Sequence, residues 1–207
     1  MVIKVKKKRN FLSILSTIFF ILGITLFGVH FYKQYTESKN VDKLKEDFML
    51  SLQDDPEVPE PGDAERPELA ENIWGLLTID SVDIELPIAI ADNFDGLYSH
   101  LVAYDFAPVP PEQGNFTIAG HNGSCPVCTF KYLHDVENGD LVTVMSKTHT
   151  MTYEVYDKLE VMNTETWVLD PVEDETTLSL LTCKYSSWTN PWRLIVRATL
   201  IDTQVNT

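Results

Sequence analysis

The sequence contains few basic residues beyond its first ten positions. The chain of 207 residues has 16 Lys and Arg against 31 Asp and Glu, a formal charge of −15. Five of the bases lie in residues 1–10, so the remainder has 11 bases and a net charge of −20. A surface of this sign repels phosphates, which excludes nucleic acid as a partner.

Cysteine is also scarce, with three residues in the whole chain. Three are too few for a scaffold built on disulfides, and the odd number leaves at least one thiol unpaired within the chain. The hydrophobic fraction of 44% is ordinary for a globular protein and excludes general disorder. We therefore expect one compact domain with attached segments.

One long hydrophobic run stands near the N-terminus. Residues 11–31 (FLSILSTIFFILGITLFGVHF) contain no Asp, Glu, Lys or Arg. About 20 apolar residues cross a bilayer as a helix, and the bases before them place residues 1–10 in the cytoplasm. A cleaved signal peptide is the alternative, but this run exceeds the usual apolar core of about 7–15 residues, and no clear A-x-A-like site follows. We expect a retained single-pass anchor in the cell membrane, with the rest of the chain extracellular.

An acidic, proline-rich linker is expected over residues 32–73. The apolar spacing in residues 32–50 permits a short amphipathic helix. Residues 51–72 contain four prolines and many acids, a composition that cannot form a core and favours an extended spacer.

The folded domain is predicted over residues 74–201, with a tail at 202–207. Its apolar runs are short and mostly typical of strands: 74–79, 82–91, 116–119, 141–145, 150–161, 177–182 and 193–201. A short helix is expected at 129–136, and residues 93–101 are the candidate for a second one. Pro87 argues for an edge strand or a bend. These elements predict a mainly β domain, a closed or nearly closed β-barrel with one or two short helices.

Three residues stand where strands begin or end. His121 follows the apolar run 116–119, Cys183 ends the run 177–182, and Arg193 opens the last strand. A thiolate is a strong nucleophile towards an amide carbonyl, histidine transfers protons near neutral pH, and arginine can stabilise an oxyanion. The three types together suit acyl transfer through a thioester. Taken singly, a lone Cys or His is more often structural.

Four segments follow one another along the chain: GNFTIAGHN (114–122), FKYLHDVENGDLVTV (130–144), LSLLTC (178–183) and RLIVRATLI (193–201). Together they resemble the sortases, membrane-anchored cysteine transpeptidases of Gram-positive bacteria. The resemblance implies that the family's catalytic histidine, cysteine and arginine are His121, Cys183 and Arg193. Arg197 is the other arginine nearby, and the family pattern favours Arg193.

The resemblance also implies a fold and a reaction. The fold is an eight-stranded sortase β-barrel that requires no cofactor. Cys183 attacks the threonine carbonyl of an LPxTG-like sorting signal on a surface protein or pilin. His121 acts as general acid for the leaving glycine amine, and Arg193 steadies the peptide and the oxyanion. An amine of a peptidoglycan precursor or of a pilin then resolves the thioester. The class within the family, the sorting motif and the acceptor stay open.

The pair Cys125 and Cys128 has no counterpart in the sortase pattern. A local disulfide or free structural thiols, redox control of Cys183, and a metal site that includes His121 are the alternatives. An acidic loop at residues 173–175 could recruit Ca²⁺, although charge runs are usually solvated.

Three other functions compete with transpeptidation. A cysteine protease would hydrolyse the same thioester with water. A membrane-tethered disulfide oxidoreductase would use Cys125 and Cys128. A non-enzymatic surface domain would form no adduct on Cys183.

Overall fold

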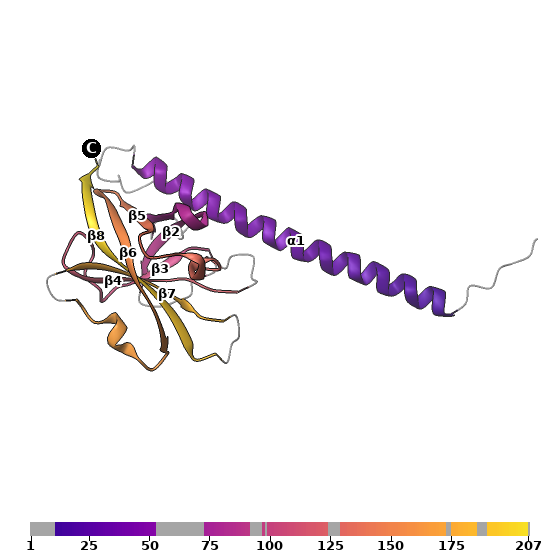
Figure 1. Cartoon of the computed structure of the whole chain (residues 1–207). Coiled ribbons are helices and arrows are strands. Elements are labelled where there is room, and N and C mark those ends of the chain that lie inside the picture. Colours follow the sequence, from indigo (N-terminus) through magenta and orange to yellow (C-terminus); the bar gives the residue numbers. More distant parts are fainter. Residues whose placement is uncertain are drawn as a thin grey trace, which may run out of the picture.

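The structure is a β-barrel from which one long helix extends (Figure 1). The computed structural model describes residues 11–52, 73–91, 97, 99–123, 129–172, 175–185 and 190–206, without the side chains of residues 11 and 12. The segment at 53–72, most of the expected linker, and the pair Cys125 and Cys128 therefore lie outside the described residues.

The described part contains one α-helix, eight strands and three short 3-10 helices. In chain order these are α1 (Phe11–Ser51), β1 (Ile73–Ile79), η2 (Asp80–Val82), β2 (Ile84–Ala91), β3 (Leu101–Tyr104), β4 (Gly114–Ala119), η3 (Leu133–Asp135), β5 (Leu141–Ser146), β6 (His149–Met162), η4 (Thr166–Leu169), β7 (Thr176–Cys183) and β8 (Trp192–Val205).

The strands close into a barrel in the order β1-β2-β3-β4-β7-β8-β6-β5. The pairs β2–β3 and β4–β7 are parallel, and the other six pairs are antiparallel. The expectation of a closed eight-stranded barrel preceded by one apolar helix is therefore confirmed.

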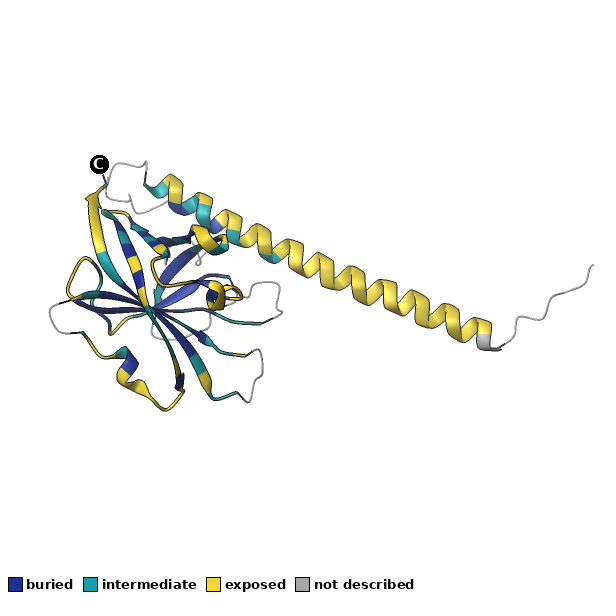
Figure 2. Cartoon of the chain, viewed as in Figure 1, coloured by how far each residue is buried: buried dark blue, intermediate teal, exposed yellow. Residues whose placement is uncertain are grey.

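Alternate residues of the strands fill the barrel. On β7 and β8 the inward side chains include Leu178, Leu180, Val196 and Ala198, all fully buried. Residues that alternate with the inward set, such as Leu181 and Ile195, face outward and pack in separate small clusters. Figure 2 shows the buried positions concentrated in the barrel strands. This alternation, which follows from the two-residue repeat of a strand, leaves the outer face of β7 and β8 available for a surface site.

Two local expectations differ from the structure. The predicted helix over 129–136 is a series of turns around the single 3-10 turn η3. Its three fully buried side chains, Phe130, Leu133 and Val136, are spaced by three residues, which fits a 3-10 repeat better than an α-helix. The possible helix at 93–101 falls mostly outside the described residues, and its last residue begins β3.

Pro87 does not lie on an edge strand, because β2 is paired with β1 on one side and with β3 on the other. It pairs with Leu76 of β1, and the ladder to β3 begins one residue later, at Ile88. The missing N–H of proline therefore falls where β2 has no partner in β3, which explains why the ladder tolerates it.

α1 continues well beyond the expected membrane span. Residues 32–51 contain no proline or glycine, so the helix runs unbroken from Phe11 to Ser51. The first part of the expected linker is therefore a continuation of α1. Residues 32–50 do not form a separate short helix. At 1.5 Å per residue its 41 residues extend about 60 Å. Its apolar part is long enough to cross a membrane, and that part is exposed along its whole length (Figure 2).

The C-terminal end of α1 docks on the barrel. Leu44 and Phe48, 6% and 3% exposed, pack with Ile73, Leu76 and Ala89 of β1 and β2. The Lys45 Nζ lies 2.8 Å from a carboxylate oxygen of Glu85 on β2. The helix that would cross the membrane is therefore attached directly to the barrel wall.

We expect Phe48→Ala to loosen this attachment. Removal of a buried phenylalanine costs about 3 kcal/mol, so the end of α1 should leave the barrel more often. Hydrogen exchange by mass spectrometry on the full chain in detergent micelles should show faster exchange in residues 41–52. Met49→Ala, at a neighbouring position that is 43% exposed, is the matched control and should change little. Equal exchange in both variants would contradict the docking contact.

Candidate active site

A groove of about 470 Å³ lies on the outer face of β4, β7 and β8. The three residues expected to carry the chemistry all line it. Its other lining residues come mainly from the strand surface and from the β6–β7 connection: Leu97, Tyr104, Ala119, Gly120, Val161, Met162, Asn163, Glu165, Thr166, Val168, Leu169, Leu181, Thr182 and Ile195.

Strand register aligns His121, Cys183 and Arg193 in one row. In the parallel β4–β7 pair Ala119 lies beside Leu181, and the Gly120 N–H donates to the Leu181 carbonyl at 3.0 Å. The same offset brings His121 beside Cys183. Cys183 is directly paired with Arg193 in the antiparallel β7–β8 ladder. Since neighbouring strands are about 4.8 Å apart, the thiol stands between the imidazole and the guanidinium.

The backbone of His121 is held from both sides. Its N–H donates to the Thr129 hydroxyl at 3.1 Å, and its carbonyl accepts from the Phe130 N–H at 2.9 Å. Burial lowers the pKa of the His121 imidazole from its ordinary value, because desolvation disfavours the charged form. His121 is therefore mostly neutral at pH 7 and able to accept a proton.

Cys183 is half-buried, and among the described residues it is the one cysteine, with a free thiol. Its carbonyl accepts a hydrogen bond of 2.7 Å from the Asn122 side-chain amide. This contact ties the loop after β4 to the end of β7. Sequence reasoning missed the role of Asn122, although the residue stands directly after His121 in the GNFTIAGHN segment.

Arg193 is oriented by the connection that precedes it. Its Nη1 donates to the carbonyls of Asn190 and Trp192 at 3.1 and 3.2 Å. A guanidinium has five N–H donors, so these contacts fix the group and leave donors for a ligand. Tyr104 of β3 lines the same groove; burial raises the pKa of its phenol, and the Arg193 charge partly opposes that shift. Sequence reasoning missed Tyr104, because its strand has only four residues.

Arg197 has a different environment. It pairs with Ser179, four residues from Cys183 along β7. Its Nη2 donates to the Val168 carbonyl at 3.2 Å, and its guanidinium lies 5.5 Å from the Trp167 ring centroid. These contacts attach η4 to the barrel, so Arg197 supports one wall of the groove and does not line it.

No metal cluster is found in the part of the chain that the structure describes. Glu173 and Asp174 of the acidic loop, like Cys125 and Cys128, lie outside that part. The Ca²⁺, disulfide, redox and metal alternatives stated for these residues stay predictions.

We expect Gly120→Ala to disturb the groove. A Cβ at this position would lie 2.6 Å from the Phe130 ring, 2.7 Å from the Thr129 hydroxyl and 2.8 Å from Leu101. Overpacking of this kind costs about 1–3 kcal/mol, and the strain falls on the two residues that hold His121. Urea unfolding should show the loss of stability. Gly139→Ala has open space but a φ of +94°, so it tests backbone strain alone. A Gly120→Ala protein as stable as the parent would contradict the close packing.

Comparisons with known proteins agree on one family. The family model "Sortase domain" matches residues 77–201. Sortase A of Bacillus anthracis is 26% identical over 210 residues, which cover 95% of this chain and 98% of that protein. The structure of a sortase D5 transpeptidase from Clostridium perfringens superposes with a TM-score of 0.59 at 25% identity, over 80% of this chain and 98% of that one. Listeria monocytogenes sortase A has the same fold, with a TM-score of 0.61 at 23% identity, over 66% and 92%. The chain belongs to the sortase family.

Proposed function

We propose that this sortase cleaves an LPxTG-like sorting signal through a thioester on Cys183. It then transfers the acyl protein to an amine of the cell wall or of a pilin. The observation that carries the proposal is the row His121–Cys183–Arg193 across β4, β7 and β8, at the floor of one groove. A nucleophile flanked by a proton carrier and a fixed cation is the arrangement that acyl transfer requires.

The first half of the reaction follows from this row. The thiol proton of Cys183 passes to the neutral His121 imidazole, and the sulfur attacks the threonine carbonyl carbon of the signal. The Arg193 guanidinium donates to the bound peptide and to the oxygen that becomes negative. His121 then returns the proton to the departing glycine amine. The carbon–nitrogen bond breaks and the thioester is left on Cys183.

The second half reverses these steps with a new amine. Its nitrogen attacks the thioester carbonyl, and its surplus proton passes to His121. The carbon–sulfur bond breaks, an amide forms, and the Cys183 sulfur takes back the proton. These steps change no oxidation state, so they require no redox cofactor.

The anchor suits substrates that are themselves attached to the membrane. The five bases in residues 1–10 favour a cytoplasmic N-terminus, so the barrel would lie outside the cell. Docking of Leu44 and Phe48 on the barrel would then hold the groove close to the bilayer surface. Such a site could reach surface proteins and pilins that are attached to the membrane near their C-termini. It could also reach cell-wall precursors carried on a lipid.

We expect a covalent adduct on Cys183 when the full chain is mixed with LPxTG-type peptides. Intact-mass spectrometry should show the mass of the acyl fragment on the parent and none on Cys183→Ala. Addition of an amine acceptor should move the acyl group into a new peptide product. If acceptor never enters the product and only hydrolysis is seen, the protein is a protease. An adduct or activity that survives Cys183→Ala but is lost in Cys125→Ala would indicate the oxidoreductase alternative.

Substitution of Arg193 should lower the rate of peptide cleavage, whereas substitution of Arg197 should mainly lower thermal stability. Arg193→Gln removes a donor beside the reacting carbonyl, and we expect kcat/KM for peptide cleavage to fall by about 10²–10³-fold. Arg197→Gln removes the contact to η4, so it should lower thermal stability while retaining far more of the acylation rate. Stopped assays of adduct formation, beside thermal melts of both variants, separate the two effects. A larger loss of acylation in Arg197→Gln would reverse the assignment.

A further inference from the structure

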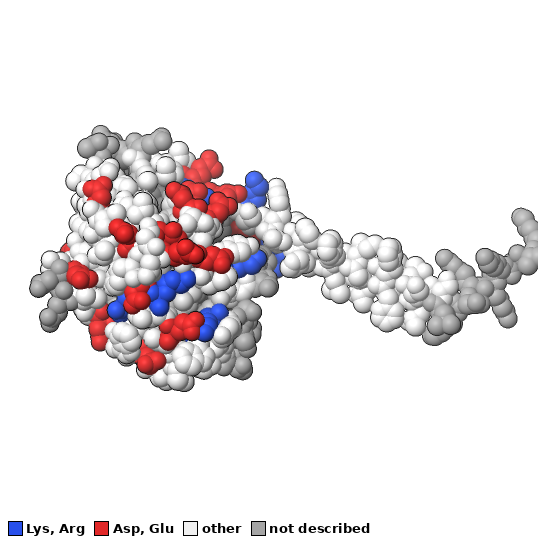
Figure 3. Space-filling model, viewed as in Figure 1, with Lys and Arg blue, Asp and Glu red and all other residues white. Residues whose placement is uncertain are grey.

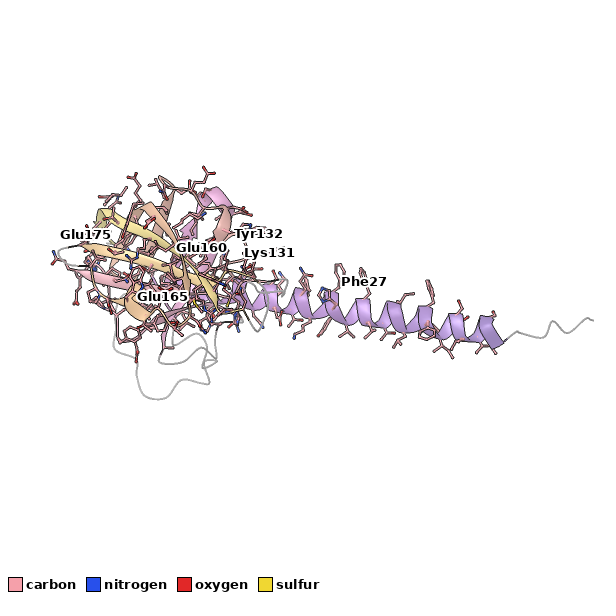
Figure 4. The ribbon with its side chains drawn as sticks, turned by 60° about the horizontal axis from the view of Figure 1, so that its bottom comes forward. Phe27, Lys131, Tyr132, Glu160, Glu165 and Glu175 are labelled. Carbon is pink, nitrogen blue, oxygen red and sulfur yellow. The ribbon has the colours of Figure 1, made fainter. Side chains whose placement is uncertain are left out.

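A second pocket of about 580 Å³ lies behind the strand ends that form the groove. Lys158 and Glu160 of β6, Lys184 after β7 and Leu194 of β8 lie on the opposite face of these strands from Cys183 and Arg193. The loop between β4 and β5 completes the pocket with Asn122, Gly123, Lys131, Tyr132 and His134, and Tyr185 borders it. Figure 4 shows Lys131, Tyr132 and Glu160 near one another.

The pocket concentrates the few bases of an acidic domain. Residues 74–207 contain six Lys and Arg against 19 Asp and Glu. Three of the six bases, Lys131, Lys158 and Lys184, line this pocket, and Glu160 is the one acid among the described residues of its lining. Figure 3 shows acids scattered over one face of the barrel and bases in small groups. A positive hollow on a negative domain is a site for an anion.

The three lysines are held in place in ways that leave them able to bind. The Lys158 Nζ donates to the carbonyls of His134 and Val136 at 2.7 and 2.6 Å, and an ammonium has a third N–H. The Lys131 Nζ lies 4.8 Å from the Tyr132 ring centroid, at an exposed position.

Lys184 forms an ion pair with Glu160. The hydrogen bond to Glu160 raises the pKa of the Lys184 ammonium, so its charge persists at neutral pH. Exposed pairs of this kind contribute little to stability, so an incoming anion can compete for the lysine. Two further acids lie nearby: an oxygen of Asp135 is 3.2 Å from the His134 ring, and the charge of Asp140 interacts with Lys158.

The pocket meets the groove at the end of β7. Asn122 follows His121, Lys184 follows Cys183, and both line the second pocket. The Asn122 amide also donates to the Cys183 carbonyl at 2.7 Å. A molecule seated among the lysines therefore lies next to the reacting thioester, on the side of the strands that the acyl peptide does not occupy.

We propose that this basic pocket binds an anionic group, a carboxylate or a phosphate, on the amine acceptor that resolves the thioester. The inference rests on the proposed transpeptidase function and adds the chemical class of the second substrate. The groove holds the acyl donor on a mostly apolar surface, whereas the lysines hold the acceptor by its negative charge. Its amine then reaches around the strand end to the thioester carbonyl on Cys183.

Acceptor selectivity tests this assignment. Two acceptor peptides that differ only in a C-terminal carboxylate or carboxamide are given to the full chain with a sorting peptide. The parent should prefer the carboxylate by about fivefold to tenfold in KM, as expected for two exposed ion pairs. Lys131→Gln with Lys158→Gln should remove the preference. Lys147→Gln, an exposed lysine in the β5–β6 turn outside the pocket, should keep it. No preference in the parent, or an equal preference in the double variant, would overturn the proposal.

Lys131→Glu is a second variant, which should fold normally because the Lys131 side chain is exposed. It should reverse the preference towards the carboxamide. An unchanged preference in this variant would also count against the site.

Direct titration separates this proposal from the proposed function. Inorganic phosphate and acetate are added separately to the full chain in micelles, and amide shifts of residues 131–136 and 158 are followed by NMR. Saturable shifts that disappear in the double variant support the pocket, and the tighter anion identifies the preferred group. Absence of saturable shifts would refute the pocket even if acylation of Cys183 occurs. Saturable shifts without any acylation would refute the transpeptidase function alone.

Discussion

The parallel pairing of β4 with β7 is the constraint on which the site depends. These strands are far apart in the chain, yet their ladder runs in one register from Gly114–Thr176 to Ala119–Leu181. A slip of one residue would turn either His121 or Cys183 towards the barrel interior, because side chains alternate between the two faces. The buried Leu178 and Leu180 oppose such a slip, since they would lose their place in the core. Packing inside the barrel therefore determines the alignment of the reactive groups outside it.

Much of the fold could be predicted from the sequence, because alternation is a local signal. Seven of the eight strands lie close to where the apolar runs predict them. β3 was missed because four residues are too few to show a period, and Tyr104 was missed with it. The docking of α1 on the barrel through Leu44 and Phe48 was not predicted, because it is a contact between distant segments that residues 32–50 alone do not reveal.

The candidate site was predictable in its residue types and not in its surroundings. His121, Cys183 and Arg193 could be named from their places at strand ends and from the sortase pattern. Arg193 and Arg197 look alike in the sequence, and only their partners in space distinguish them. Arg197 is bound to the Val168 carbonyl and lies on Trp167, whereas Arg193 is paired with Cys183. Such partners arise when the β6–β7 connection folds back on the sheet, and no local pattern encodes that step.

The two faces of the β6–β8–β7 strands suit two substrates of different chemistry. On the groove face, Val161, Leu181 and Ile195 offer apolar surface, on which a nearly neutral peptide can lie by its side chains. On the other face, Lys131, Lys158 and Lys184 offer positive charge to an anionic group. If both substrates bound on the same face, the acyl chain would exclude the acceptor amine. Water would then resolve the thioester. In the proposed reaction, one layer of strands separates the two substrates, and Cys183 lies at the end of β7, where both faces are accessible.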